Sequence, residues 1–428
     1  MKILNIILCL MVVWSLRAQE TPAPPQTQSI AIYGGTAHIG NGQVIESSLI
    51  TFENGKLTMV ADMSSIRFNK DAYGKAIDAT GKHVYPGFIA PNTQLGLIEI
   101  SAVRATRDNS EIGDMNPHVR SIIAYNTDSD VPPTVRANGV LLAQVKPNGG
   151  TIDGQSSIVE LDGWNWEDAV YKMDEGIFVD YPSMYRWNWR TRSVNKNKDY
   201  GKQIQAIEDY FKEAIAYSKN DKLTAKNLKF EAMRGLFDGS KKLYVTVDRA
   251  RSITEAVLLF QQFNVTPIIV GGSEAWAVAE FLKKNNVPVI LSKTHDLPSY
   301  DDSNIDQPFK SPAMLQKAGV TWCLQMDDSP ENLRNLAFQA GHAVGFGLDK
   351  EVAVAAITLN TAKILGIDKT VGSLEKGKDA TLFISTGDAL DIRSNHVEHA
   401  FIRGKEISMD DKQKRLYRKF KKKYEEEK

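Results

Sequence analysis

The sequence predicts a mixed α/β fold: a (β/α)8 TIM barrel joined to a small split β-sandwich domain that is built from both ends of the chain. Three observations lead to this fold class. Short β-type segments, separated by glycine and asparagine turns, occur near both ends. The middle alternates apolar strands with amphipathic helices, as parallel βα units do. The span from Pro86 to Gly366 can hold a barrel of about 250 residues. A doubly wound parallel sheet is the alternative for this middle region.

The first residues have the features of an export signal. Lys2 precedes an apolar run over residues 3–16, which is short for a bilayer span, and Ala18 offers a small residue for cleavage. We expect a signal peptide over residues 1–18 and a Pro-rich linker over 19–28. The mature chain would then be periplasmic or secreted, and we expect no membrane span after cleavage. An uncleaved anchor is the alternative.

The β-type segments near the two ends predict one composite domain. They lie at residues 29–33, 48–52 and 56–60, and again at 380–384 and 399–403. Because both groups flank a middle of different character, the simplest arrangement is a single β-sandwich over residues 29–85 plus 367–408.

The barrel is expected over residues 86–366. Its predicted strands are apolar throughout, as in sheets covered on both faces. The region from about Trp164 to Asp238 is less regular and rich in aromatic residues, so we expect an elaborated loop and helices beside the barrel. The predicted strands are 243–247, 266–270, 287–291 and 320–325. One predicted helix starts at Ser252, and the others cover 274–284, 311–318, 329–346 and 350–365.

Residues 409–428 predict a charged C-terminal helix with a narrow apolar stripe. The stripe consists of Leu416, Tyr417, Phe420 and Tyr424. We expect the stripe to dock onto the body of the protein; binding of an acidic partner is the alternative.

Composition excludes some classes of function. Of the 428 residues, Lys+Arg and Asp+Glu both total 52, so the formal net charge is zero. A body built for nucleic acid or for an anionic membrane surface would carry net positive charge. Cys323 is the one cysteine outside the predicted signal peptide, so we expect a packed strand residue and no intramolecular disulfide.

The segment from Val352 to Phe383 resembles the amidohydrolase superfamily, and within it the imidazolonepropionase-like and prolidase-like branch. A helix with the pattern T-x-N-x-A-x-x-L-G leads there into G-S-L-E-x-G-K-D-A. The matching residues are Thr358, Asn360, Ala362, Leu365, Gly366, 372–375 and 377–380. The stretch "VYPGFI" at 84–89 falls where the first barrel strand of this family is expected.

The resemblance implies a TIM barrel that hydrolyses C–N bonds with one or two divalent metals, zinc or another ion. The ligands are His-x-His after strand one, a lysine or glutamate after strand four, histidines after strands five and six, and an aspartate after strand eight. All lie at the carboxyl ends of the strands, where barrel enzymes keep their sites.

Most of these ligands are missing here. Asn92 and Gln94 stand at the two first-strand histidines, and neither offers the imidazole nitrogen that zinc prefers. Thr246 falls near the strand-five histidine. Asp328, or Asp327 in the adjacent register, remains for strand eight as the candidate catalytic residue. The strand-four ligand has no assignable counterpart. We therefore expect no metal and no other cofactor.

Other polar residues at strand ends would line the barrel mouth. His295 follows a barrel strand and could reach a pocket, although a solvated loop residue is the alternative. The further residues that we expect at the mouth are Asp248, Arg249 and Glu274.

We expect an exported amidohydrolase-like protein with a degenerate metal site. It would serve as a binding or scaffolding protein and would be catalytically weak or silent. Its ligand would be small and polar or peptide-like, and its partners a second copy or an active amidohydrolase relative; nucleic acid is not expected. The alternative is a hydrolase of non-peptide or dipeptide-like C–N bonds with a rearranged metal site. A third hypothesis is an interaction protein that acts through the basic tail.

Overall fold

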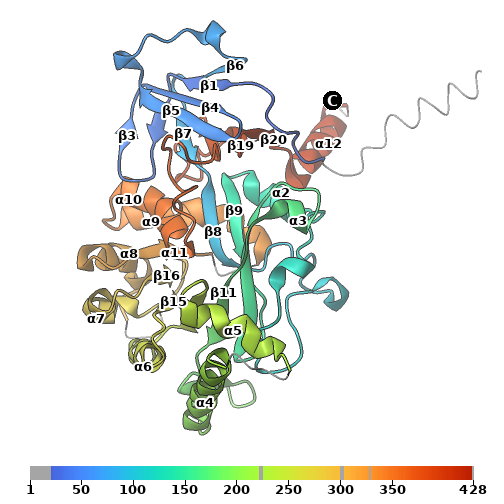
Figure 1. Ribbon diagram of the computed structural model, residues 1–428. Helices are drawn as coiled ribbons and strands as arrows, with labels where there is room; N and C mark the ends of the chain where they lie inside the picture. Colours follow the sequence, from blue (N-terminus) through green and yellow to red (C-terminus); the bar gives the residue numbers. More distant parts are fainter. Residues whose placement is uncertain (1–20, 221–224, 299–302, 327–328, 427–428) are drawn as a thin grey trace, which may run out of the picture.

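The computed structural model describes residues 21–220, 225–298, 303–326 and 329–426. A barrel-like sheet occupies the centre of the molecule, and a β domain built from an N-terminal and a C-terminal segment of the described chain lies at one end of it (Figure 1). The predicted signal peptide lies outside the described residues.

The central sheet has eight strands in the order β17-β16-β15-β14-β11-β10-β9-β8. The helix α11 (Leu359–Leu365) contacts both edge strands and lies at the seam between them. The predicted barrel is therefore confirmed in its main features. Its strands are β8 (Phe88–Thr93), β9 (Val140–Val145), β10 (Ile152–Glu160), β11 (Val170–Asp180), β14 (Lys242–Val247), β15 (Pro267–Gly271), β16 (Val289–Leu291) and β17 (Trp322–Leu324).

One strand departs from the strict βα alternation. β10 runs antiparallel to both β9 and β11, whereas the other neighbouring pairs are parallel. The link from β9 to β10 turns through Gly149 and Gly150, which have φ values of 111° and 98°. A link this short cannot hold the crossover helix that a parallel partner needs, so the chain returns antiparallel.

Helices cover the outside of the barrel. α6 (Ala250–Gln261) begins two residues before the predicted start at Ser252, and residues 350–365 form two helices, α10 (Lys350–Ala356) and α11. The irregular region from about Trp164 to Asp238 forms elements beside the barrel, as predicted (Figure 1), but it also supplies the barrel strand β11, which the prediction did not include. The irregular region contains α3 (Trp166–Ala169), the hairpin of β12 (Tyr185–Asn188) and β13 (Ser193–Lys196), α4 (Tyr200–Ser218) and α5 (Leu228–Asp238). The other helical elements are α2 (Val131–Arg136), the 3-10 turn η5 (Ala275–Val278), α7 (Ala279–Lys284), α8 (Gln307–Ala318), the 3-10 turn η6 (Pro330–Asn335) and α9 (Leu336–Gly345).

The β domain consists of two sheets. One has the order β5-β4-β1-β6 and comes from the N-terminal part, whereas the other has the order β20-β19-β18-β7-β2-β3 and combines both ends. Phe52 and Phe401 pack edge to face between them, 5.0 Å apart. The strands are β1 (Ile30–Tyr33), β2 (Thr36–His38), β3 (Val44–Ile45), β4 (Ser48–Glu53), β5 (Lys56–Asp62), β6 (Lys75–Asp78), β7 (His83–Pro86), β18 (Leu382–Ser385), β19 (Val397–Ile402) and β20 (Lys405–Ile407).

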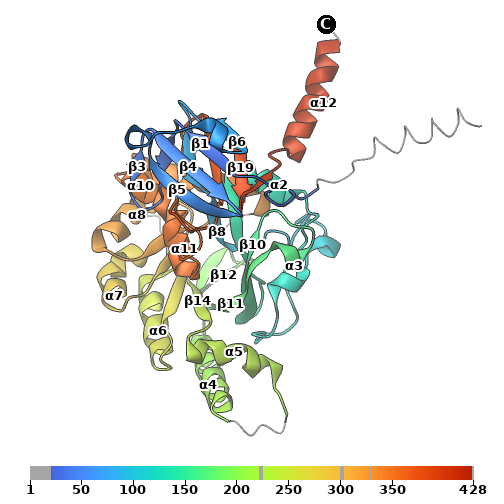
Figure 2. The same ribbon diagram turned by 45° about the horizontal axis from the view of Figure 1, so that its top comes forward.

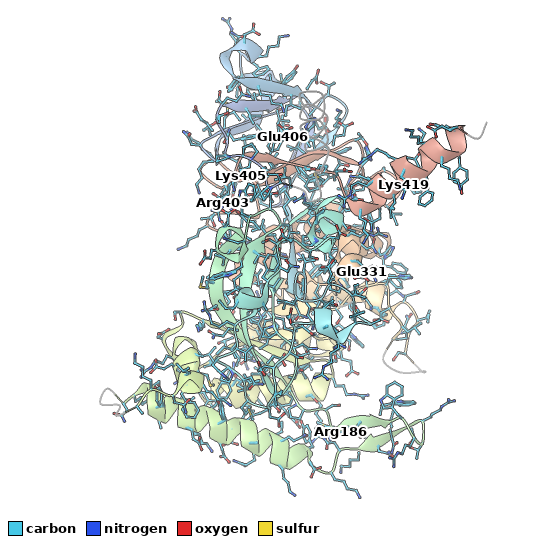
Figure 3. All side chains as sticks on the ribbon, turned by 90° about the vertical axis from the view of Figure 1, so that its right-hand side faces the viewer. Arg186, Glu331, Arg403, Lys405, Glu406 and Lys419 are labelled. Atoms are coloured by element: carbon cyan, nitrogen blue, oxygen red, sulfur yellow. The ribbon has the colours of Figure 1, made fainter. Side chains whose placement is uncertain are left out.

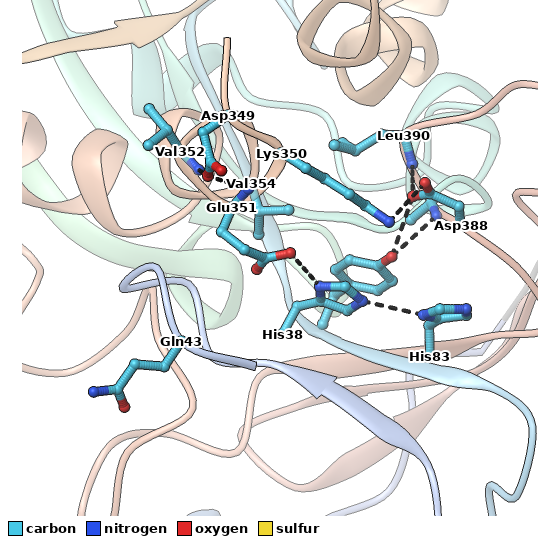
Figure 4. A network of polar contacts seen from close by, with 12 residues as sticks. His38, Gln43, His83, Asp349, Lys350, Glu351, Val352, Val354, Asp388 and Leu390 are labelled. Carbon is cyan, nitrogen blue, oxygen red and sulfur yellow. Dashed lines mark hydrogen bonds and ion pairs between the residues drawn. The ribbon is translucent and has the colours of Figure 1, made fainter. Parts of the chain in front are cut away.

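A polar network joins this domain to the barrel (Figure 4). His38 Nδ1 lies 2.8 Å from Glu351 Oε1 on α10, and His38 Nε2 lies 3.1 Å from His83 Nδ1. The His38 ring stacks on Tyr85 at 4.3 Å. Burial lowers the pKa of His83, and electrostatic repulsion between the two histidine rings acts in the same direction. The contact of His38 with Glu351 therefore joins β2 to α10, whereas the contact with His83 lies within the β domain.

The C-terminal helix α12 (Lys412–Glu426) projects from the body (Figure 2). Ion pairs from Lys412 and Arg415 to Asp130 tie its first turn to the body. The prediction that its apolar stripe docks is wrong, because no residue of this helix is buried. The stripe lies mostly beyond the anchored turn, where the helix has already left the surface.

A search of the described helices found none that combines the length and the apolar character of a membrane span.

Candidate functional site at the barrel mouth

The strand register places one set of polar residues at the same end of the barrel. Asp180 pairs in register with Thr246, which pairs with Val270; Gly271 pairs with Leu291, which pairs with Leu324. On the other side of the seam, Thr93 pairs with Val145. These positions form the carboxyl-terminal rim of the parallel strands, which is where barrel sites are built.

Asn92 bridges the seam of this rim. Its side-chain Nδ2 donates to Gln325 Oε1 at 2.7 Å, which connects β8 with the residue that follows β17. Its backbone N–H donates to Gln144 Oε1 at 3.0 Å. Asn92 has a φ of 51°, a left-handed conformation that asparagine tolerates better than most residues. Asn92, at the first-strand ligand position, therefore forms an amide–amide hydrogen bond between the two edges of the barrel sheet.

A buried carboxylate continues this chain of contacts into the barrel. Glu175 accepts hydrogen bonds from Gln144 Nε2 (2.5 Å), Ser156 Oγ (2.6 Å) and Tyr244 Oη (2.8 Å). Burial raises the pKa of Glu175, and the three donors oppose that shift. Through Gln144 the network reaches Asn92, so polar contacts link five of the eight strands inside the barrel.

A second buried pair lies beside the rim. Lys146 Nζ, just after β9, is 2.9 Å from Asp153 Oδ2 and 5.0 Å from the centre of the Phe178 ring. The backbone N–H of Gly149 donates to Asp153 Oδ1 at 2.8 Å. Burial raises the pKa of Asp153 to about 6, although Lys146 favours the charged form.

The predicted strand-one and strand-five residues lie at the mouth. Gln94 Oε1 accepts from Asn109 Nδ2 at 2.9 Å. The hydroxyl of Thr246 is buried, as are Asn92 Oδ1 and Asn109 Oδ1, and none of the three has a hydrogen-bond partner within the described part of the chain.

Three other predicted residues hold the loops around β14 and β15. Glu274 Oε2 accepts from the backbone N–H of Ala250, at the start of α6, at 2.9 Å. Asp248 Oδ1 accepts from the N–H of Ser273 at 3.3 Å. The Arg249 guanidinium lies over the Tyr185 ring at 5.5 Å. These contacts give the three side chains structural partners at the edge of the mouth.

His295 lies on an exposed loop, apart from this network. Its backbone N–H donates to Gln339 Oε1 at 2.8 Å. Its ring lies 5.4 Å from the ring of His342 and 6.1 Å from that of Phe309. Asp327 and Asp328, the candidate strand-eight residues, lie outside the described residues.

Sequence reasoning missed several polar residues of the barrel. Most of them were hidden because they fall in, or next to, a region whose strands were not assigned, whereas Gln325 ends the predicted strand 320–325 but gave no sign of its contact with Asn92. Asp180 carried a usable signal: the run "GIFVD" ends an apolar strand with aspartate, as "LYVTVD" does at Asp248. Asp180 closes the fourth strand of the sheet, where the family resemblance implies a lysine or glutamate. The others are Gln144, Lys146, Asp153, Glu175 and Gln325.

The described residues by themselves offer no metal site of the kind that the fold family implies. A catalytic zinc site takes three protein ligands drawn from His, Cys, Asp and Glu. Across residues 21–426, the gaps in the description excepted, no group of three or more such side chains could hold a metal ion. The amides of Asn92 and Gln325 instead bond to each other.

Comparison with known proteins places the fold. A family model described as "Amidohydrolase family" matches residues 226–407. Among solved structures, an amidohydrolase from Thermotoga maritima MSB8 is similar, with 23% identity and a TM-score of 0.75 over 89% of this chain and 99% of that one. A search of curated proteins gave no match.

Two further structures resemble the chain at lower scores. A Xaa-Pro dipeptidase with bound methionine is 13% identical, with a TM-score of 0.56 over 89% of this chain and 100% of that one. An adenosine deaminase from Xanthomonas campestris with bound zinc is 16% identical, with a TM-score of 0.51 over 92% and 99%. Residues 226–407 thus match the amidohydrolase family in sequence, and the chain has the fold of solved amidohydrolases, prolidase-like ones included.

Proposed function

We propose that this chain is an amidohydrolase-like binding protein whose barrel mouth holds a small polar or peptide-like ligand. The observation that carries the proposal is the bond from Asn92 Nδ2 to Gln325 Oε1 at 2.7 Å. It occupies the seam between strands one and eight, where a metal enzyme of this fold needs open ligand groups. An amide pair contributes neither an imidazole nitrogen nor a carboxylate to a metal.

Unsatisfied polar atoms indicate what such a ligand would offer. Asn92 Oδ1 and Asn109 Oδ1 are buried acceptors, and Thr246 Oγ1 is a buried hydroxyl, all without a partner among the described residues. Buried polar atoms are nearly always hydrogen-bonded in folded proteins. A ligand with N–H or O–H donors would satisfy them, and amide-containing molecules carry such donors. The dipeptidase neighbour makes dipeptides the first compounds to test.

The alternative is hydrolysis of non-peptide or dipeptide-like C–N bonds at a rearranged site. Asp180 favours it, since this half-buried carboxylate closes the fourth strand beside Thr246. Asp328 or Asp327 would have to complete that site. Export, and pairing with a second copy or an active relative, remain predictions from the sequence.

Elemental analysis separates the two functions. The protein is purified from cells grown with zinc, manganese and iron available, and its metal content is measured together with hydrolysis of cyclic amides and dipeptides. We expect far less than one metal ion per chain and no turnover. A near-stoichiometric metal content with turnover would overturn the proposal in favour of the hydrolase.

Binding is tested by calorimetric titration with a panel of dipeptides. Asn92→Ala should abolish the heat of binding that the unmodified chain shows, because it removes the amide at the mouth. Asn41→Ala, at an exposed site in the β domain, is the matched control and should bind as the unmodified chain does. Equal binding by both variants would place the ligand elsewhere.

A further inference from the structure

Positive charge is concentrated in two elements of a chain that is neutral overall. The helix α12 contains eight lysines and arginines and two glutamates. Residues 185–198, which include the hairpin β12–β13, contain five lysines and arginines and no acidic residue. Because the whole chain has zero net charge, the remainder is correspondingly acidic. The zero total therefore conceals two basic surfaces.

The helix α12 combines this charge with an apolar face. Leu416, Tyr417, Phe420 and Tyr424 are 44%, 66%, 49% and 60% exposed, and their spacing places them on one side of the helix. Lys419 lies 6.0 Å from the ring of Phe420. Beyond the anchored first turn, the helix presents an apolar stripe with lysines beside it.

The hairpin has the same chemistry in a β structure. Tyr185 and Trp187 alternate onto one face, and Val194 is the cross-strand neighbour of Trp187. Trp189 packs edge to face against Trp187 with ring centres 6.1 Å apart. These four side chains are between 46% and 84% exposed, which is far more than a buried role would require.

The two elements project from the same side of the molecule. Figure 3 shows α12, with Lys419 labelled, and the hairpin, with Arg186 labelled, extending in the same direction from opposite ends of the body. A single extended surface could touch both at once.

We propose that α12 and the hairpin β12–β13 together dock the protein on an anionic lipid surface. A helix with an apolar stripe bordered by lysines has the composition of helices that lie in the membrane interface. Tryptophan and tyrosine are enriched at that same depth, and basic side chains pair with anionic headgroups. Nucleic acid would satisfy the charges and would leave Leu416 and Phe420 without an apolar phase. The acidic remainder of the chain would face away from the lipid.

Vesicle co-sedimentation tests this proposal. The chain from Gln19 onward is used, so that the apolar residues 3–16 do not contribute. We expect it to sediment with vesicles of phosphatidylglycerol mixed with phosphatidylcholine, to stay in solution with phosphatidylcholine alone, and to be released by salt. The double variant Leu416→Glu/Phe420→Glu should lower the bound fraction by about tenfold, since it places charges on the apolar stripe.

Matched variants identify the surface. Trp187→Ala/Trp189→Ala should also weaken binding, whereas Ile112→Glu, at a 93% exposed site outside both elements, should bind as the unmodified chain does. All variants should show the same thermal melt. Absence of binding to anionic vesicles, or binding that the helix and hairpin variants leave unchanged, would overturn the proposal. So would a dimer in solution that Leu416→Glu/Phe420→Glu dissociates, because the stripe would then belong to a second copy.

Discussion

At the residue scale, Asn92 shows how one side chain can occupy the place of a metal ligand and take a structural role. Its amide joins the two edge strands of the barrel, and its backbone bonds to Gln144. Its backbone is left-handed, with a φ of 51°. The sequence predicted that this residue lies at the mouth. It could not predict Gln325 as the partner, because the seam contact depends on how the barrel closes.

Replacing Asn92 should therefore weaken the fold. Asn92→Ala leaves Gln325 Oε1 without its donor, and we expect the free energy of unfolding to fall by about 1–3 kcal/mol. Urea denaturation measures this change. Asn92→Gly accepts the left-handed backbone without strain and also lacks the amide. A glycine variant as stable as the unmodified protein would show that the amide pair contributes nothing.

Glu160, at the end of β10, should give the stability a measurable pH dependence. It is 2% exposed, and burial raises its pKa to about 7, although Arg403 Nε lies 2.6 Å from its carboxylate. The folded state then keeps a proton that the unfolded state releases at lower pH. The contribution of Glu160 to the stability of the folded state is therefore fully present below about pH 4.5 and is lost as the pH rises through 7.

The comparison with Glu160→Gln isolates this contribution. Between pH 5 and pH 8, the unfolding free energy of the unmodified protein should fall by about 2–3 kcal/mol relative to that of the variant. Urea titrations at both pH values provide the measurement. Parallel pH profiles for the two proteins would contradict the assignment.

At the element scale, the pattern of strands and helices was predictable, whereas two breaks in it were not. Residues 350–365 have one continuous helical pattern, yet the helix is interrupted between Ala356 and Leu359. The carbonyl of Ile357 accepts from the backbone N–H of Ile89 on β8 at 2.9 Å. A long-range bond to the barrel edge thus takes priority over a local helical bond. The antiparallel direction of β10 also depends on more than local pattern, because it follows from the short link between β9 and β10.

The helix α10 begins at a side-chain cap formed by Asp349. Asp349 Oδ1 accepts from the backbone N–H groups of Glu351 and Val352 at 2.9 and 3.1 Å. Asp349→Ala should lower the free energy of unfolding by roughly 1 kcal/mol, because both donors lose their acceptor. Asp349→Asn retains an acceptor and should cost less. Equal losses in urea denaturation for both variants would show that the carboxylate acts in another way.

At the scale of the whole molecule, the barrel and the composite β domain form the stable body, and α12 is an appendage. The His38–Glu351 contact couples the two parts of the body, and the His38–His83 contact links two strands within the β domain. The pattern of residues 409–428 predicted the helix correctly but not its exposed stripe. Amphipathic spacing alone does not say whether an apolar face meets the same chain or an external surface.

Deleting residues 412–428 should leave the body intact. No side chain of α12 is buried, so the free energy of unfolding should change by no more than about 0.5 kcal/mol. Ending the chain after Asp379 instead removes β18, β19 and β20, and should abolish cooperative unfolding of the β domain. A large loss of stability in the shorter deletion would show that the helix packs on the body after all.

The composite sheet also has a consequence for the order of events during synthesis. β7 lies between β2 and β18, and β18 is separated from it by the entire barrel. While the chain is still emerging, Val84 and Tyr85 have no partner on the β18 side until residues 382–407 follow. The last strands to be made are thus the ones that close the first domain, and a chain released early would expose an open sheet edge that quality-control proteases can recognise.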